Sequence, residues 1–465
     1  MRPTRRTVLT ATTASAAALG TAGRAEAAAT PGGGRPPATA QRPSRELRAL
    51  LGELDRSRIE ATIRRLVSFG TRHTLSAQDD PKRGIGAARD WLLAELRSYA
   101  AESGGRMTVE LQSYVQEPAS RIPTATRITN VVATLRGSVT PERMYVVSGH
   151  YDSRVTDVMN ATADAPGADD DASGVAVALE LARVMAKRRP AATIVFAAVA
   201  GEEQGLYGST YMAQQFKAAG TDVQGMFTND IVGSSTADDG TKDPYTIRLF
   251  AEGVPSSETP EQAATRKSVG GENDSATRQL ARFVRDVADN DATGMHVRVV
   301  YRRDRYLRGG DHIPYLERAY PAARFTEPAE DFAHQHQDVR VENGKQYGDL
   351  PEFCDFDFVT RVAKVNAAAL WTLAQAPGTP KGAKIVTSAL TNSTTLVWSR
   401  GSEPDLAGYE VVWRETTAPE WTRVIPAGDV TTYEVDLSKD NVFFGVRAVN
   451  TKGLRSPVAF PAPQT

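Results

Sequence analysis

Residues 144–153 read MYVVSGHYDS, and residues 193–203 read TIVFAAVAGEE. Each stretch begins with an apolar run of strand length and ends in charged or polar side chains. Strands that are apolar throughout are typical of parallel sheets covered by helices on both faces. Ligand sites in such sheets lie beyond the carboxyl ends of the strands. These two stretches therefore predict an α/β fold with a chemical site at one edge of its sheet.

The chain around these two stretches alternates helical and strand-like patterns. Helices are expected over residues 46–69 (one or two helices), 87–101, 172–187, 276–287 and 356–373, and further strands over 107–115, 129–135, 224–231, 245–250, 297–301 and 322–326. This alternation predicts a mostly parallel central sheet flanked by helices, in a domain that spans residues 45–376.

The composition changes after Ala376, where Pro377 to Pro380 reads as a linker. Short strands are expected over residues 394–398, 408–414, 431–436 and 441–449, and Trp398, Tyr409, Trp413 and Tyr433 are candidate core aromatics. This spacing is typical of a small all-β, immunoglobulin-like sandwich over residues 377–465. The stretch from Phe443 to Asn450 resembles fibronectin type III modules. Such a module would assist attachment to substrate or to a surface, or would act only as a spacer.

The overall composition excludes several classes of protein. The 465 residues are 41% hydrophobic and 24% charged, which is ordinary for a globular chain of about three domains. A net charge of −1 gives no global field that would attract nucleic acid. The single cysteine, Cys354, excludes an intramolecular disulfide and a zinc site built from cysteines.

The first 29 residues read as an export signal. Arg5 and Arg6 precede an uncharged Ala/Thr-rich run, and small residues follow at Ala27 to Ala29. The stretch Thr4–Leu9 resembles a twin-arginine signal, which predicts a secreted protein. Residues 30–44 read as a flexible linker. The run is too weakly apolar for a membrane anchor, so we do not expect an integral membrane protein.

Five polar motifs carry the candidate chemistry. They are Gly149–Ser153 with His150 and Asp152, Gly167–Gly174 with Asp169 to Asp171, Gly201–Ser209 with Glu202 and Glu203, Asn229–Gly233 with Asp230, and His334–Asp338. Each motif is weak by itself, because acidic residues at a helix start can simply cap it. Jointly they offer two imidazoles and three carboxylates, nearly all that a two-metal hydrolytic site needs. We expect the Asp152 carboxylate to accept the second ring N–H of His150.

These motifs together resemble metallopeptidase family 28, the aminopeptidase Y group of co-catalytic di-zinc exopeptidases. The resemblance covers most of residues 45–375, and its motifs are GHYDS, PGADDDASG and GEEQGLYGS. It implies that His150 and Asp230 hold one zinc, Asp170 bridges, and Glu203 helps to hold the second zinc. It also implies that Glu202 is the general base and that Asp152 supports His150, with Asp169 and Asp171 structural.

The last ligand depends on the register of residues 334–338. The family pattern places its histidine four residues before an aspartate, which selects His334 ahead of Asp338, whereas His336 fits only with a slipped register. His312 resembles a segment that is not a ligand. Many relatives carry a tyrosine before the late histidine, where this chain has Ala333, so oxyanion stabilisation falls to the metals or to a residue such as Tyr301 or Tyr306.

The resemblance implies a secreted aminopeptidase with two Zn²⁺ ions that acts on peptides. Co²⁺ or Mn²⁺ could occupy the same ligands. A carboxypeptidase or dipeptidase would use the same ligand set with a different pocket. A glutaminyl cyclase of this fold binds one zinc, and a non-catalytic binding protein would be expected to lack a ligand; the complete set argues against both.

Overall fold

The computed structural model describes residues 39–388 and 390–464. The predicted export signal, and most of the predicted linker at residues 30–44, lie outside these described residues. Within the described part of the chain, no helix is both long and apolar enough to cross a membrane.

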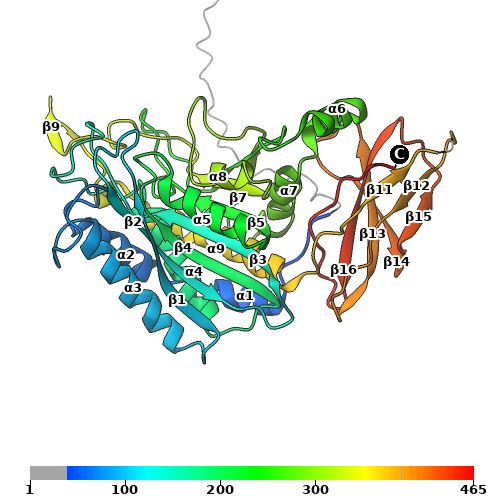
Figure 1. Ribbon diagram of the computed structural model, residues 1–465, viewed down its shortest axis with the longest axis horizontal. Helices are drawn as coiled ribbons and strands as arrows, with labels where there is room; N and C mark the ends of the chain where they lie inside the picture. The colour runs from blue at the N-terminus through cyan, green and yellow to red at the C-terminus, as the bar shows by residue number, and fades with distance from the viewer. Residues whose placement is uncertain (1–38, 389, 465) are drawn as a thin grey trace, which may run out of the picture. The chain divides into compact units, whose positions relative to one another are not determined.

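The larger sheet of the described chain has eight strands (Figure 1). They are β1 (Met107–Gln116), β2 (Thr126–Leu135), β3 (Thr140–His150), β4 (Ala192–Val199), β5 (Asp222–Asn229), β6 (Thr246–Ala251), β7 (His296–Val300) and β8 (Ala322–Thr326). Their spatial order is β1-β2-β4-β3-β5-β8-β6-β7. Each predicted strand corresponds to one of these elements, with ends shifted by a few residues.

The four central strands, β4, β3, β5 and β8, run parallel to one another. The strands at the two sides of the sheet differ from these. On one side β2 runs antiparallel to both β1 and β4, and on the other side β6 runs antiparallel to β8. The predicted α/β fold is confirmed, and the whole sheet is mixed, with its parallel part at the centre. Consequently the carboxyl ends of β3, β4, β5 and β8 meet at one edge.

Helices cover both faces of this sheet (Figure 1). One face packs against α3 (Ile85–Ala101), α4 (Ala172–Ala186), α7 (Ala276–Ala288) and α9 (Phe356–Gln375), joined by α1 (Arg45–Leu51) and α2 (Arg56–Val67). The other face packs against α5 (Tyr207–Ala218) and α8 (Ile313–Leu316). A further helix, α6 (Pro260–Val269), has no buried residue.

The pattern of β3 shows why this arrangement suits the sequence. Tyr145 and Val147 belong to the hydrophobic cluster on one face, and Val146 between them belongs to the cluster on the other. Successive side chains of a strand point to opposite faces, so a strand covered twice must be apolar at every position. Burying each such valine contributes roughly 1.5–3 kcal/mol to folding.

The C-terminal residues form two smaller sheets. One has the order β15-β12-β11-β17, from β11 (Lys384–Val386), β12 (Thr394–Val397), β15 (Thr432–Val435) and β17 (Ala462–Gln464). The other has the order β14-β13-β16, from β13 (Leu406–Glu415), β14 (Arg423–Gly428) and β16 (Val442–Asn450). Leu396 of one sheet and Val411 of the other share a hydrophobic cluster, as expected for a sandwich.

A buried ion-pair cluster joins this sandwich to α7. Asp274 is almost completely buried, 2.9 Å from Arg282 of α7 and 2.6 Å from Arg414 of β13. Beside it, Trp421 Nε1 donates a hydrogen bond to Gln279 Oε1 at 2.9 Å. Burying these charged groups is costly unless they stay paired. The contact therefore makes the sandwich a structural partner of the larger sheet domain.

Candidate metal centre

The predicted site residues lie on loops at the carboxyl edge of the central strands. His150 is the last residue of β3, Asp230 directly follows β5, and Glu202 and Glu203 lie on the turn after β4. Asp170 lies just before α4. The parallel order of these strands brings the separate motifs together, as the sequence predicts.

Three of these side chains form a first group that could hold a metal ion. His150 Nε2 lies 3.0 Å from Asp170 Oδ1 and 3.9 Å from Asp230 Oδ1. One ligand atom of each residue lies within 4.8 Å of the others, and all three residues are buried.

A second group shares Asp170 with the first. His336 Nε2 lies 2.9 Å from Asp170 Oδ2 and 3.0 Å from Glu203 Oε1. Glu203 Oε1 is buried and has no hydrogen-bond partner of good geometry, despite the nearby imidazole. Ligand atoms that converge without hydrogen-bonding one another are expected around a cation. The two oxygens of Asp170 thus face one group each.

The electrostatics of the two groups also favour a cation. Burial lowers the pKa of His336, but the carboxylates of Glu203 and Asp170 outweigh it and raise that pKa to about 10. Burial likewise opposes the charged form of His150, yet Asp152 and Asp170 raise its pKa well above the ordinary value. The cluster therefore binds protons strongly when it holds no metal. A divalent cation can replace these protons.

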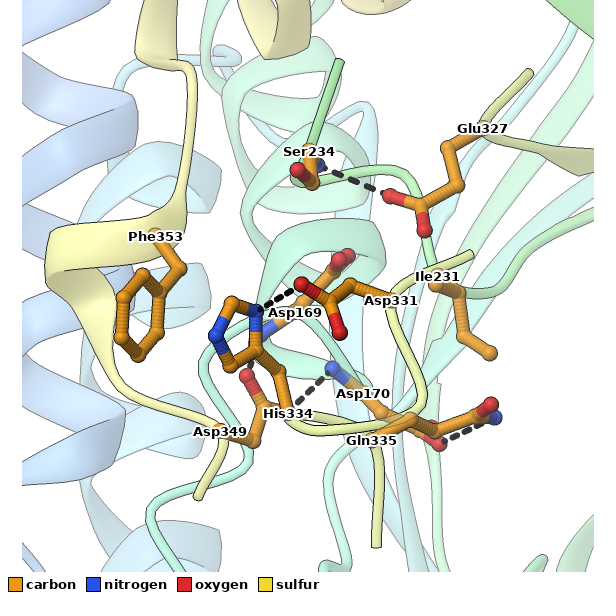
Figure 2. A pocket seen from close by; sticks show the side chains of 10 residues that line it. All are labelled: Asp169, Asp170, Ile231, Ser234, Glu327, Asp331, His334, Gln335, Asp349 and Phe353. Carbon is orange, nitrogen blue, oxygen red and sulfur yellow. Dashed lines mark hydrogen bonds and ion pairs between the residues drawn. The ribbon is translucent and has the colours of Figure 1, made fainter. Parts of the chain in front are cut away.

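The structure corrects the prediction that His334 is the fifth ligand. The His334 ring stacks on Phe353 with centroids 3.6 Å apart, and its Nδ1 lies 3.5 Å from Asp331 (Figure 2). His336 has a positive φ of 56°, a rare conformation that turns the chain inside the motif. This turn directs the His336 side chain to Asp170, so the slipped register is the one adopted.

Asp152 supports the site differently from the expectation. His150 Nδ1 lies 3.1 Å from the main-chain carbonyl of Asp152 and 3.6 Å from its carboxylate. The carboxylate instead accepts the main-chain N–H groups of Glu202 at 3.3 Å and Glu203 at 3.1 Å. It also accepts the Thr74 hydroxyl at 3.0 Å. Asp152 therefore orients His150 through its backbone and positions the Glu202–Glu203 turn through its side chain.

Glu202 lies in the cleft beside both metal-binding groups. The cleft has a volume of about 360 Å³, and Asp170, Asp230, Glu203 and His336 also line it. Burial, together with the charges of Asp230 and Glu203, raises the pKa of the Glu202 carboxyl well above its ordinary value. A carboxyl group poised in this way can accept and return a proton during a reaction.

The neighbouring aspartates build the loop that presents Asp170. Asp171 caps α4 by accepting the N–H of Gly174 at 3.0 Å, and it also accepts the N–H of His150 at 2.9 Å. Asp169 Oδ1 accepts the N–H of Gly233 at 2.6 Å. Asp349, which the sequence did not single out, accepts the N–H groups of Asp169 and Asp170, both at 2.8 Å (Figure 2). These bonds fix the backbone around Asp170.

Arg324 is a second residue that sequence reasoning missed. It lies in β8 and is completely buried, with its guanidinium 2.7 Å from Asp230 Oδ2. The signal was present, because an arginine inside an otherwise apolar strand needs a buried partner.

Neither tyrosine considered for oxyanion stabilisation lines the cleft. The Tyr301 hydroxyl donates a hydrogen bond to the Pro419 carbonyl at 3.2 Å, and Tyr306 is 76% exposed. His312 is buried, and its Nε2 lies 2.7 Å from the Arg303 carbonyl, consistent with the non-ligand position implied by its motif.

Known proteins that are similar to this chain show the family to which it belongs. The sequence profile described as peptidase family M28 matches residues 130–343, which include all the metal-binding groups. A protein of Pyrenophora teres f. teres named "Probable zinc metalloprotease" is 58% identical over 425 residues, covering 91% of this chain and 88% of that one. A protein of Leptosphaeria maculans, also named a probable zinc metalloprotease, is 58% identical over 421 residues, covering 90% of this chain and 98% of that one.

The fold is shared with a solved structure at lower identity. The LapA aminopeptidase of Legionella pneumophila superposes with a TM-score of 0.51 at 20% identity, covering 71% of this chain and 75% of that one. The family profile and the named relatives, on a fold with this site, define a zinc metallopeptidase. With relatives this similar over nearly its whole length, the chain belongs to peptidase family M28.

Proposed function

We propose that this chain is a secreted exopeptidase that holds two zinc ions and removes N-terminal residues from peptides. The observation that carries the proposal is the pair of metal-binding groups that share Asp170, with Glu202 in the same cleft. His150 and Asp230 would hold one ion, Glu203 and His336 the other, and Asp170 would bridge them. Mixed imidazole and carboxylate ligands favour zinc.

When bound, zinc supplies Lewis-acid catalysis and makes water acidic enough to be deprotonated near neutral pH. Glu202 accepts the proton from the attacking water as the scissile carbonyl is attacked, and it then returns a proton to the leaving amine. Asp152 holds the Glu202 and Glu203 main chain in place through its carboxylate. These two hydrogen bonds hold the general base Glu202 and the metal ligand Glu203 in fixed positions relative to each other.

The N-terminal preference and the export are supported by the sequence. The motifs resemble the aminopeptidase Y group, and the first 29 residues resemble a twin-arginine signal. The C-terminal sandwich would serve attachment to substrate or a surface.

The test is hydrolysis of aminoacyl p-nitroanilides and their N-acetylated counterparts by purified enzyme, before and after chelation and zinc add-back. We expect turnover on free amino termini, loss on chelation and recovery after two equivalents of zinc. Equal turnover of the acetylated series would overturn the N-terminal preference. Turnover that survives chelation would overturn metal dependence.

A further inference from the structure

Four arginines line the same cleft as the acidic residues of the candidate metal centre. Arg121, Arg154, Arg305 and Arg308 line the same cavity as Asp170, Glu202, Glu203 and Asp230. The four carboxylates all have roles in the proposed site, three as metal ligands and Glu202 as base. The lining therefore leaves no further carboxylate to bind a substrate cation, whereas it offers several cations.

Two of the arginines are neutralised by carboxylates of the protein. Arg305 and Arg308 lie 3.5 Å and 2.5 Å from Glu330 Oε2, and Arg305 also lies 3.1 Å from Asp304. The positive charges of Arg305 and Arg308 are therefore balanced within this ion-pair network.

Arg121 and Arg154 are different, because they bond only to backbone carbonyls. Arg121 Nη1 donates to the Glu203 carbonyl at 2.9 Å. Arg154 donates from Nε to the Val155 carbonyl and from Nη2 to the Thr156 carbonyl, both at 3.1 Å. Across residues 39–388 and 390–464, neither guanidinium has a carboxylate within 4.0 Å. These bonds fix the side chains while their charge stays available.

The hydrogen bond of Arg121 to Glu203 also shows where the positive charge of Arg121 lies in the cleft. Its guanidinium lies against the main chain of Glu203, the residue whose carboxylate belongs to the second metal-binding group. An anion bound there lies close to the bond that the proposed site would cleave. A planar guanidinium with free N–H groups matches a carboxylate in charge and in geometry.

We propose that Arg121 and Arg154 bind a carboxylate of the peptide substrate next to the scissile bond. This inference rests on the proposed function and narrows its substrate class. The carboxylate has two possible sources: the C-terminus of a dipeptide, or the side chain of an acidic residue flanking the cleaved bond. Both sources offer the same chemistry to the two arginines.

The experiment uses substrate pairs that differ only in this charge. Ala-Ala and Ala-Ala amide test the terminal carboxylate, while Ala-Glu amide and Ala-Gln amide, with the p-nitroanilides of Glu and Gln, test a side chain. We expect Arg121→Gln and Arg154→Gln to raise KM about 10-fold or more for the charged member of a pair, as loss of a charge-assisted hydrogen bond predicts. The KM values of the neutral members should rise much less than those of the charged members, because a neutral member has no carboxylate for the arginines to bind.

Two variants act as controls. Arg97→Gln removes one exposed charge from α3, away from the cleft lining, and should leave all KM values unchanged. Arg154→Lys keeps the charge but not the planar fork, and should recover part of the affinity. The pair that responds to the Gln variants identifies the source of the carboxylate.

The proposal would be overturned if Arg121→Gln and Arg154→Gln raised the KM of charged and neutral members equally. It would also be overturned if Arg97→Gln raised the KM of the charged members as much as they do. If zinc-loaded wild-type enzyme cleaves none of these peptides, the proposed function fails separately. Calorimetric binding of the same pairs then decides the arginine inference: a charge preference that Arg154→Gln removes supports it, and equal affinities overturn it.

Discussion

Arg324 Nη1 lies 2.7 Å from Oδ2 of Asp230, a member of the first metal-binding group, and both side chains are buried. The same guanidinium donates hydrogen bonds to the main-chain carbonyls of Asp230 at 3.2 Å and Gly309 at 2.9 Å. Although burial opposes its charge, Asp230 and Asp304 raise the pKa of Arg324 above its ordinary value. One oxygen of Asp230 is thus committed to Arg324, and the other faces His150.

The first prediction concerns this pair. Replacing Arg324 by Met leaves Asp230 buried without its cation, and breaking a buried ion pair costs about 3–5 kcal/mol. We expect a lower free energy of unfolding, measured by urea denaturation, with a larger loss in the metal-free protein than with zinc bound. The exposed Arg298→Met on β7 is the matched control. A metal-free Arg324→Met protein as stable as wild type would contradict the structural role of the pair.

The two histidines of the last motif should behave differently. His336 faces Asp170 and Glu203, so His336→Gln should reduce bound zinc from two equivalents to about one. His334 stacks on Phe353 outside both groups, so His334→Gln should retain two equivalents and lose only stacking energy, about 0.5–1.5 kcal/mol. Zinc is counted by elemental analysis after dialysis. If His334→Gln lost one zinc equivalent and His336→Gln kept both, His334 would be the ligand, as the sequence predicted.

A third prediction uses a buried carboxyl group of α7. Burial raises the pKa of Asp286 to about 7, well above the value near 3.9 of an unfolded chain. The folded protein therefore binds one more proton than the unfolded chain between these values. The stability this proton contributes is complete below about pH 4, falls as the pH rises and is lost above about pH 7.

Asp286→Asn should abolish this dependence, because a neutral amide replaces the neutral acid. We expect the free energy of unfolding of the variant to match that of wild type near pH 4. As the pH rises to about 7, it should exceed the wild-type value by about 1.4 kcal/mol more for each pH unit. The exposed Asp238→Asn serves as control. A difference between variant and wild type that stays constant from pH 5 to pH 8 would show that Asp286 does not titrate in this range.

The fourth prediction concerns the C-terminal sandwich. Arg414 and Arg282 together neutralise buried Asp274, so Arg414→Met should destabilise the protein by about 3–5 kcal/mol. Deletion of residues 377–465 would expose the same surface of α7 and should lower the melting temperature of the remaining domain. Calorimetry checks both variants. A truncated domain that melts at the wild-type temperature would show that the sandwich is only appended.

The fold was predictable where the signal is local. The strand β4 is apolar at nearly every position, β3 is apolar from Met144 to Val147, and α9 carries a long apolar stripe. Each of these elements is recognisable without tertiary information. The helix α5 was missed, because only Met212 and Ala213 among its large or apolar residues are buried. Such a narrow apolar contact leaves little periodicity in the sequence.

The site was predictable where ligands follow strands. His150, Asp170, Glu203 and Asp230 lie where the carboxyl ends of β3, β4 and β5 bring them together. The register of the late histidine was not predictable, because it depends on the positive φ of His336 within an irregular loop. The charge balance of the cleft also depends on Arg121, which lies in a loop distant in sequence from the ligand motifs.

The most direct test of the account is a joint measurement of bound zinc and turnover in Glu202→Gln. Glu202 belongs to neither metal-binding group, so the variant should retain two zinc equivalents and wild-type stability. Loss of the general base should lower kcat by about 10²–10⁴-fold. Turnover within a few-fold of wild type, with both zinc ions bound, would contradict the assignment of Glu202 and the mechanism built on it.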